Sequence, residues 1–475
     1  MSSVASFSTL HLLQIFLGVS VVISMLNRFG SSFSEPVIEP VHEITFCDTL
    51  NVKRLLITEN YANDVGCKIV QNFFYLIVSA GLFYSLFRGL LTFILKTLYP
   101  EKLKVQQDYA YEPTVSILLP SYNEGKTVYE TMESICKSDY PVEKFEIIGV
   151  DDCSVDNSYE YMLKAQKDFP QVRMRLARND ENSGKVKSVE RALAQSEADV
   201  IISIDSDCIF HPQVIHELVS CLADPEIGAV GGQVGIRNAS ENWYTMGQVL
   251  WYYLAFNFIK TPEIWAKATT CISGCLFCIR RGLMLKIMPV AVNRMFLGAH
   301  VIEGEDRFMT HMVLLNGYKN FINVNAKCWT TAPATFTQLF KQQLRWRRSA
   351  LRDIFFTLTS IPRHLKTVPL YYTYTVVMSF VMMILATLTL LTAPFQNIMF
   401  WLGLDRWVWG LGLAAAAALI VKAFAPEQHI SNPVKLFAFS AWVLVDCVFL
   451  TTLALCTLDI GDWGTRDKTE EYNAI

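Results

Sequence analysis

The sequence predicts an α/β domain with a mostly parallel β-sheet, inserted between N-terminal and C-terminal transmembrane helices. Short runs rich in Val and Ile alternate with amphipathic stretches between about residues 112 and 335, which is typical of a parallel sheet covered by helices. The 475 residues are 52% hydrophobic and only 18% charged, which is more apolar than a soluble protein of this length usually is.

Charge and cysteine content argue against two classes of site. The net charge of −3 lacks the basic footprint of a protein that binds nucleic acid. Cys271, Cys275 and Cys278 cluster in the sequence without a fourth ligand nearby, so small buried side chains are favoured over a zinc site. Reduced thiols are expected in the cytosolic segments, while Cys47 and Cys67 flank a loop in which they could pair.

Two apolar runs near the N-terminus, at about 10–26 and 69–95, are each long enough to cross roughly 30 Å of hydrocarbon. The segment between them is polar and poor in cations, whereas Lys96, Lys102 and Lys104 follow the second run. The positive-inside rule therefore places residues 1–100 as transmembrane helices with an external loop, and the following domain in the cytosol.

Three further apolar runs, at about 371–391, 408–424 and 434–455, predict a C-terminal transmembrane region over 366–458 and a tail over 459–475. Three crossings would place that tail outside, although its motif, described below, belongs inside. A re-entrant segment or a further crossing within 392–404 would resolve the conflict, and the sequence leaves both open.

The central segment, 112–335, is long enough to enclose its own core. Its predicted strands are Val115–Leu119, Phe145–Val150, Val172–Leu176, Val200–Ile204 and Ile227–Val230. Its predicted helices are Val128–Lys137, Ser158–Asp168, Lys185–Gln195 and Pro212–Leu222. The aromatic stretch Trp243–Lys260 fits an interfacial helix and a core helix equally well.

Acidic residues follow two of these strands. Asp152 comes after the second strand, and Asp205 and Asp207 come directly after the fourth. Ligands of open α/β sheets lie outside the carboxyl ends of the strands, and Mg²⁺ binds carboxylates together with substrate phosphates. Lys185 opens a helix, where its ammonium and the helix dipole both attract a phosphate. The pattern indicates a metal-chelated nucleotide diphosphate, although Asp205-Ser206-Asp207 alone would also serve as a helix cap.

Two motifs follow the sheet. In Gly304-Glu305-Asp306-Arg307 a carboxylate is placed to act as a general base, although a surface ion pair would explain the same residues. Gln342, Arg345 and Trp346 share one face of a predicted amphipathic interface helix over 336–365. A juxtamembrane helix explains the neighbouring cations Lys341, Arg347, Arg348 and Arg352, but not the Gln and Trp beside Arg345.

Together these motifs resemble the processive family-2 glycosyltransferases, the group of hyaluronan synthases, chitin synthases and chitin-oligosaccharide synthases. The matching motifs extend from about Thr114 to Trp346, in the same order as in the family. Trp463-Gly464-Thr465-Arg466 extends the resemblance towards the hyaluronan and chitin synthases. One departure lies in the expected acceptor-facing loop, 271–276, where Cys275 replaces a more usual Pro.

The resemblance implies a Rossmann-like nucleotide-sugar transferase domain and a role for each motif. Asp207 would coordinate Mg²⁺ or Mn²⁺, and Asp306 would deprotonate the acceptor hydroxyl. The residues expected to bind the UDP-sugar donor are Asp152, Lys185, Asp205, Arg345, Trp463 and Arg466. The residues expected on the acceptor side are Gln342, Trp346 and Glu305.

The resulting hypothesis is a membrane-embedded, processive, inverting β-glycosyltransferase. It would use UDP-N-acetylglucosamine, with UDP-glucuronate as an open second donor, to elongate and export a polysaccharide of hyaluronan or chitin type. Its partners would be the donor, the growing polymer and the bilayer of a plasma or inner membrane, with the catalytic domain in the cytosol. Two alternatives stay open: transfer of a single sugar to a lipid acceptor, and a non-catalytic transporter or scaffold with an inactive transferase domain.

Overall fold

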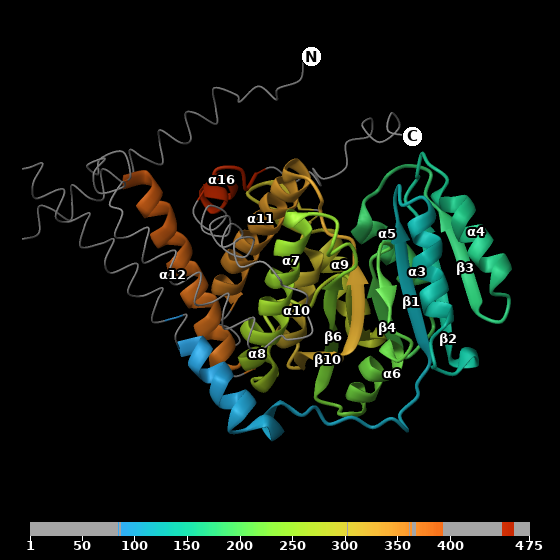
Figure 1. Cartoon of the computed structure of the whole chain (residues 1–475), viewed down its shortest axis with the longest axis horizontal. Helices are drawn as coiled ribbons and strands as arrows, with labels where there is room; N and C mark the ends of the chain where they lie inside the picture. Colours follow the sequence, from blue (N-terminus) through green and yellow to red (C-terminus); the bar gives the residue numbers. More distant parts are fainter. Residues whose placement is uncertain are drawn as a thin grey trace, which may run out of the picture.

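A large β-sheet organises the chain in the computed structural model, which describes residues 84, 87–301, 303–360, 362, 367–392 and 449–459. Its strands are β1 (Val115–Ser121), β2 (Phe145–Asp151), β3 (Arg173–Arg178), β4 (Val200–Ile204), β5 (Ile209–Phe210), β6 (Ile227–Ile236), β7 (Leu276–Arg280) and β10 (Lys319–Thr330). Their order in space is β3-β2-β1-β4-β7-β6-β10-β5 (Figure 1).

The sheet is mostly parallel, as the sequence predicts. Parallel pairs join β1 to β2 and β4, β2 to β3, and β6 to β10. β7 runs antiparallel between β4 and β6, and β5 runs antiparallel at the edge beside β10. Every residue of β1, β2 and β4 is buried, which explains why these strands are continuous apolar runs in the sequence.

Helices cover both faces of this sheet. Those of the central domain are α3 (Lys126–Cys136), α4 (Ser158–Asp168), α5 (Lys185–Ala194), α6 (Val214–Val219), α7 (Trp243–Leu254), α8 (Thr261–Trp265), α9 (Arg281–Val292) and α10 (Glu305–Leu315). α3 and α4 pack together, and α5 packs against α9, which in turn contacts α10. α5 returns the chain from edge strand β3 to β4, so a right-handed crossover places it on the face opposite α3 and α4.

The predicted elements before residue 223 are found with small shifts. Ser158–Asp168 and Val200–Ile204 have the predicted bounds, β3 begins at Arg173 rather than Val172, and the helix predicted over Pro212–Leu222 is α6 followed by a 3-10 turn, Ser220–Ala223. β7 and β10 are not among the predicted strands. The reason is compositional, because β7 has only one β-branched residue, Ile279, and β10 interrupts its apolar residues with Lys and Asn.

Three helices pack beside the domain: α11 (Phe336–Ser360), α12 (Leu370–Thr392) and α16 (Thr451–Leu455). Leu351, Met383, Ala454 and Leu458 form a small apolar core between them. Within the described ranges, no helix combines the length and the hydropathy needed to cross a membrane. The runs at 10–26 and 408–424, most of 69–95 and of 434–455, Cys47 and Cys67 lie outside those ranges, so these spans stay a prediction. The run at 371–391 forms α12, which is among the helices to which this finding applies.

Candidate active site

Lys185 connects the two acidic motifs. Its Nζ lies 2.7 Å from Asp205 Oδ1 and 2.8 Å from Glu305 Oε1. Burial disfavours the charged ammonium, but the two carboxylates outweigh burial and raise the pKa of Lys185 well above its usual value. Burial likewise opposes ionisation of Asp205, and Lys185 beside it lowers the pKa of that carboxyl. A charged ammonium therefore joins the end of β4 to the start of α10.

Asp152 holds the turn that presents Lys185. Its carboxylate accepts hydrogen bonds from the backbone amides of Ser183 and Gly184, at 2.9 and 2.8 Å, and from Asn179 Nδ2 at 2.7 Å. Gly184 has φ +87°, a conformation that favours glycine, and Lys185 is the first residue of α5. In the described structure Asp152 thus positions the helix that begins with Lys185.

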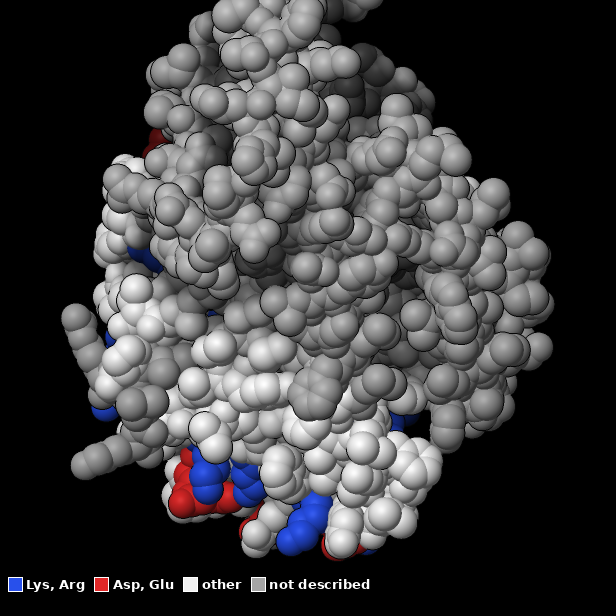
Figure 2. All heavy atoms as spheres, turned by 90° about the vertical axis from the view of Figure 1, so that its left-hand side faces the viewer, with Lys and Arg blue, Asp and Glu red and all other residues white. Residues whose placement is uncertain are grey.

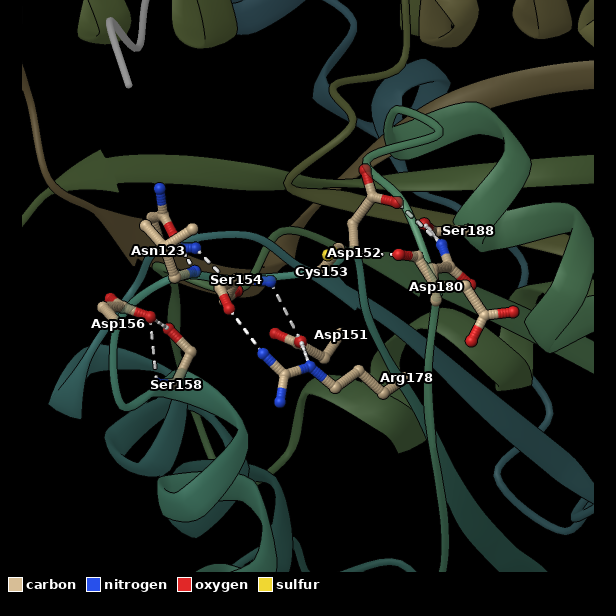
Figure 3. A network of polar contacts seen from close by, with 12 residues as sticks. Asn123, Asp151, Asp152, Cys153, Ser154, Asp156, Ser158, Arg178, Asp180 and Ser188 are labelled. Carbon is tan, nitrogen blue, oxygen red and sulfur yellow. Dashed lines mark hydrogen bonds and ion pairs between the residues drawn. The ribbon is translucent and has the colours of Figure 1, made fainter. Parts of the chain in front are cut away.

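A second polar network ties the loops after β1 and β2 together (Figure 3). Arg178 Nε lies 3.1 Å from Asp151 Oδ2, and Arg178 Nη2 donates to the Ser154 carbonyl at 2.6 Å. The backbone amide of Asn123 donates to Ser154 Oγ at 2.9 Å. Asn123 and Cys153 both have positive φ, at 53° and 62°. Left-handed backbone at non-glycine residues is costly and concentrates at functional sites, so these loops are held in a specific shape.

The loop with Asp205 and Asp207 is fixed from two sides. Ser206 Oγ donates to Glu124 Oε1 at 3.1 Å, and the Ser206 carbonyl accepts from Thr131 Oγ1 at 2.8 Å. Asp207 Oδ2 accepts from Thr330 Oγ1, at the end of β10, at 3.2 Å. The apolar strand that precedes Asp205 in the sequence gives no sign of Glu124 or Thr330, because both come from distant elements.

Asp306 lies beside Lys185 across the loop that precedes β7. Asp306 Oδ2 accepts from the backbone amide of Gly274 at 3.2 Å, and the Cys271 thiol donates to the same oxygen at 3.7 Å. The expected acceptor-facing loop, 271–276, therefore contacts Asp306. A β-carbon on Gly274 would stand 2.8 Å from Lys185 Nζ, so only glycine leaves room for the ammonium in its present place.

α11 brings the remaining motif to this site. Gly304 has φ +75°, and a β-carbon there would overlap the side chain of Ser349 on α11, so helix and loop touch directly. The ring centroids of Trp346 and Tyr252 lie 6.4 Å apart. The positive charge of Arg345 helps Lys185 to lower the pKa of Asp205. In the described part of the chain, Gln342 Oε1 is buried and has no hydrogen-bond partner.

Two simpler interpretations of these motifs are wrong in the structure. Glu305 is buried and pairs with Lys185 rather than forming a surface ion pair with Arg307. Arg352 is buried and pairs with Glu303, so it is not one of the solvated cations of a juxtamembrane helix. Glu305, expected on the acceptor side, contacts Lys185, which is expected to bind the donor. Trp463 and Arg466 lie outside the described residues.

The metal-binding prospects follow from the same geometry. Among the described residues, no three His, Cys, Asp or Glu side chains are grouped to hold a metal ion, and the cysteine cluster forms no such site there. Lys185 lines a small cavity together with Ser203, Phe277 and Met309. A Mg²⁺ site needs only one or two protein carboxylates when substrate phosphates complete it, and Asp205 and Asp207 fit that donor set.

Comparisons with known proteins indicate the class of protein. Residues 116–286 match the model of the family described as glycosyl transferase family 2. An N-acetylglucosaminyltransferase of Mesorhizobium japonicum is 29% identical over 363 residues, which cover 75% of this chain and 82% of the relative. An N-acetylglucosaminyltransferase of Rhizobium meliloti is 28% identical over 364 residues, covering 76% and 83%.

A solved structure supports the fold assignment. The mannosyltransferase PcManGT from Pyrobaculum calidifontis, in complex with GDP-Man and Mn²⁺, has a TM-score of 0.54 and 18% identity, covering 80% of this chain and 98% of its own. The fold is therefore the Rossmann-like α/β fold of the GT-A glycosyltransferases. Residues 116–286 match a glycosyltransferase family 2 domain, and the protein is a glycosyltransferase.

Proposed function

We propose that this protein transfers N-acetylglucosamine from UDP-N-acetylglucosamine, with inversion, to the end of a growing β-linked polysaccharide of chitin or hyaluronan type. The observation that carries the proposal is the contact of Lys185 with both Asp205 and Glu305, with Asp306 directly beside them. The relatives are named N-acetylglucosaminyltransferases, which supports the choice of sugar.

In the proposed reaction Asp306 accepts the proton of the acceptor hydroxyl. The acceptor oxygen then forms a bond to the anomeric carbon of the donor, and the bond from that carbon to UDP breaks with its electron pair. Lys185 is placed to offset the negative charge that develops on the departing diphosphate. One base without a nucleophile implies direct displacement, so an α-linked donor gives a β-linked product.

A divalent cation belongs to this proposal. Mg²⁺ or Mn²⁺, when bound, would neutralise part of the diphosphate charge. Asp207 is the proposed ligand, with Asp205 next to it, and Thr330 keeps one Asp207 oxygen oriented. The Mn²⁺ in the complex of the archaeal mannosyltransferase supports a metal-dependent reaction here.

Processivity and export are proposed from α11 and the membrane segments. Gln342 and Trp346 would contact the acceptor sugar, with Trp346 stacking on its ring. The apolar runs outside the described residues would embed the enzyme as an integral, multi-pass membrane protein with its domain in the cytosol. Figure 2 shows the side of the molecule on which α12 lies, where charged side chains of the described residues gather mainly along the lower edge. Exposed apolar side chains in the predicted transmembrane regions support this placement, among them Phe87, Leu90, Leu370 and Val377.

The test is incorporation of radiolabelled sugar by the purified protein in detergent. UDP-N-acetylglucosamine alone, then together with UDP-glucuronate, separates a chitin-type from a hyaluronan-type product, and digestion with chitinase or hyaluronidase identifies it. The proposal expects products that lengthen with time. A single sugar added to a lipid would instead support the alternative acceptor, and absence of transfer from any UDP-sugar would overturn the proposal.

A further inference from the structure

Buried charges join α11 to the loop that leads to Asp306. Glu303 and Arg352 are almost fully buried, and Arg352 Nη1 lies 2.6 Å from Glu303 Oε1. Glu303 precedes Asp306 by three residues, and Arg352 follows Trp346 by six on the same helix. This ion pair therefore joins the loop before the proposed base to the helix that carries the proposed acceptor-binding residues.

A second buried pair reinforces the first. Arg294 Nη1 lies 3.3 Å from Asp353 Oδ1 and donates to the Gly304 carbonyl at 3.2 Å. Arg294 Nη2 also donates to the Glu303 carbonyl. Arg294 thus binds the backbone carbonyls of residues 303 and 304, and Arg352 binds the Glu303 side chain. Each ion pair has one member on α11, Arg352 in the first pair and Asp353 in the second.

The C-terminal segment enters the same network. The Leu458 carbonyl accepts from Arg352 Nε at 3.1 Å and from Arg352 Nη2 at 3.0 Å. Arg352 consequently contacts the Asp306 loop, its own helix and the chain just beyond α16.

Stability alone is a weak reason for such a network. Replacing a buried ion pair by packed apolar side chains is often neutral or stabilising. In the described structure Glu303 Oε2 and Asp353 Oδ2 are also buried without hydrogen-bond partners, which adds a desolvation penalty. The charged network instead fixes the relative positions of the loop and the helix, because each guanidinium sets the angle and distance of its carboxylate.

We propose that Glu303 and Arg352 are positioning residues, which hold Asp306 at a fixed place relative to Gln342 and Trp346 and make that place depend on the docked C-terminal segment. The proposal rests on the role of Asp306 as base in the proposed function. Neither residue touches the substrate in this account, and both act through the loop and the helix.

The test separates positioning from folding by replacing the pair in two ways. Glu303→Met and Arg352→Met each leave one buried charge unpaired, and the double variant leaves none. The matched control is Glu226→Met with Lys319→Met, which removes an exposed ion pair of the same 2.6 Å length between the residue before β6 and the start of β10. Thermal unfolding, kcat and the donor KM are measured for all variants in detergent.

Positioning predicts that the double variant regains the wild-type Tm while its kcat stays on the order of 10- to 100-fold low, with donor KM within about twofold of wild type. The control pair keeps wild-type kcat. A double variant with both wild-type Tm and wild-type kcat would overturn the proposal. So would single variants whose kcat falls only in proportion to their folded fraction.

Hydrogen exchange measures the docking without any sugar transfer. In the double variant, amides of 303–308 and 349–353 are expected to exchange faster than in wild type, while those of β1 and β2 keep their rates. Unchanged exchange at 303–308 would overturn the positioning role. Wild-type protein that transfers no sugar would overturn the proposed function instead, so the two failures are distinguishable.

Discussion

The ammonium of Lys185 occupies the space that a side chain on Gly274 would need, since a β-carbon there would stand 2.8 Å from Nζ. Gly274→Ala should therefore shift Lys185 away from Asp205 or Glu305. The ammonium is the far end of a flexible side chain, so folding is expected to change little. Transfer should fall about 10- to 100-fold, because misplacement by roughly 1 Å has that effect. Gly282→Ala is the matched control, with open space around its β-carbon.

Asp306→Asn should remove the proton acceptor while keeping the shape of the side chain. General-base catalysis typically contributes 10²- to 10⁴-fold, so we expect kcat to drop by about that amount with Tm unchanged. Asp168→Asn, on the exposed face of α4, serves as control. Wild-type kcat in Asp306→Asn would remove the base from the proposed reaction and revive a non-catalytic role for the domain.

Gly304→Ala tests the contact between the Asp306 loop and α11. The new β-carbon would overlap Ser349, and φ of +75° is itself strained for alanine. Ser349→Gly opens the space, so the double variant should recover part of the lost unfolding free energy. A coupling of about 0.5–3 kcal/mol between the two changes is expected from denaturant unfolding. Strictly additive effects would mean that the helix can move away freely.

Asp353 should make stability depend on pH. Burial raises the pKa of Asp353 from 3.8 to about 7, although Arg294 and Arg307 partly oppose the shift. The folded state then binds the proton more tightly than the unfolded state, so this group's contribution to stability falls as pH rises from about 4 to about 7. The free energy of unfolding of Asp353→Asn should equal that of wild type near pH 4 and exceed it by up to roughly 4 kcal/mol near pH 8. A constant difference across that range would contradict the shifted pKa.

Asp207→Asn should weaken metal use rather than folding. Asparagine keeps the hydrogen bond to Thr330 possible but loses the charge that a hard cation prefers. The variant should need a higher Mn²⁺ or Mg²⁺ concentration for half-maximal transfer, measured by metal titration after EDTA treatment. Wild-type transfer that survives EDTA unchanged would argue against a metal on the diphosphate.

The sequence predicts the first half of the domain better than the second. β1, β2 and β4 are buried on both faces, so their apolar runs are unmistakable, and acidic residues at their ends mark the site. β10 has polar residues within it, and β7 has only one β-branched residue. Local patterns therefore do not reveal the reversal of β7 or the place of Gly274.

The partners of the motif residues were harder to predict than the motifs. Arg352 belongs to a cationic run in the sequence, and only the packing of α11 on the Glu303 loop shows that it is buried. Glu303 itself stands next to Gly304-Glu305-Asp306, which is the one local sign of its role. Asn179 and Thr330 gave no such sign, because their contacts join segments that are distant in the chain.

The antiparallel course of β7 has a consequence for how such an enzyme changes its specificity. Asp205 and Asp207 follow the carboxyl end of β4, whereas Cys271 and Gly274 precede the amino end of β7. Because β7 is antiparallel to β4, these two ends lie at the same edge of the sheet. In the proposed function, the donor-binding and acceptor-facing residues therefore come from separate segments, one ending near Asp207 and one beginning near Cys271. Grafting residues 266–275 from a relative should exchange the acceptor while the nucleotide-sugar preference is inherited unchanged.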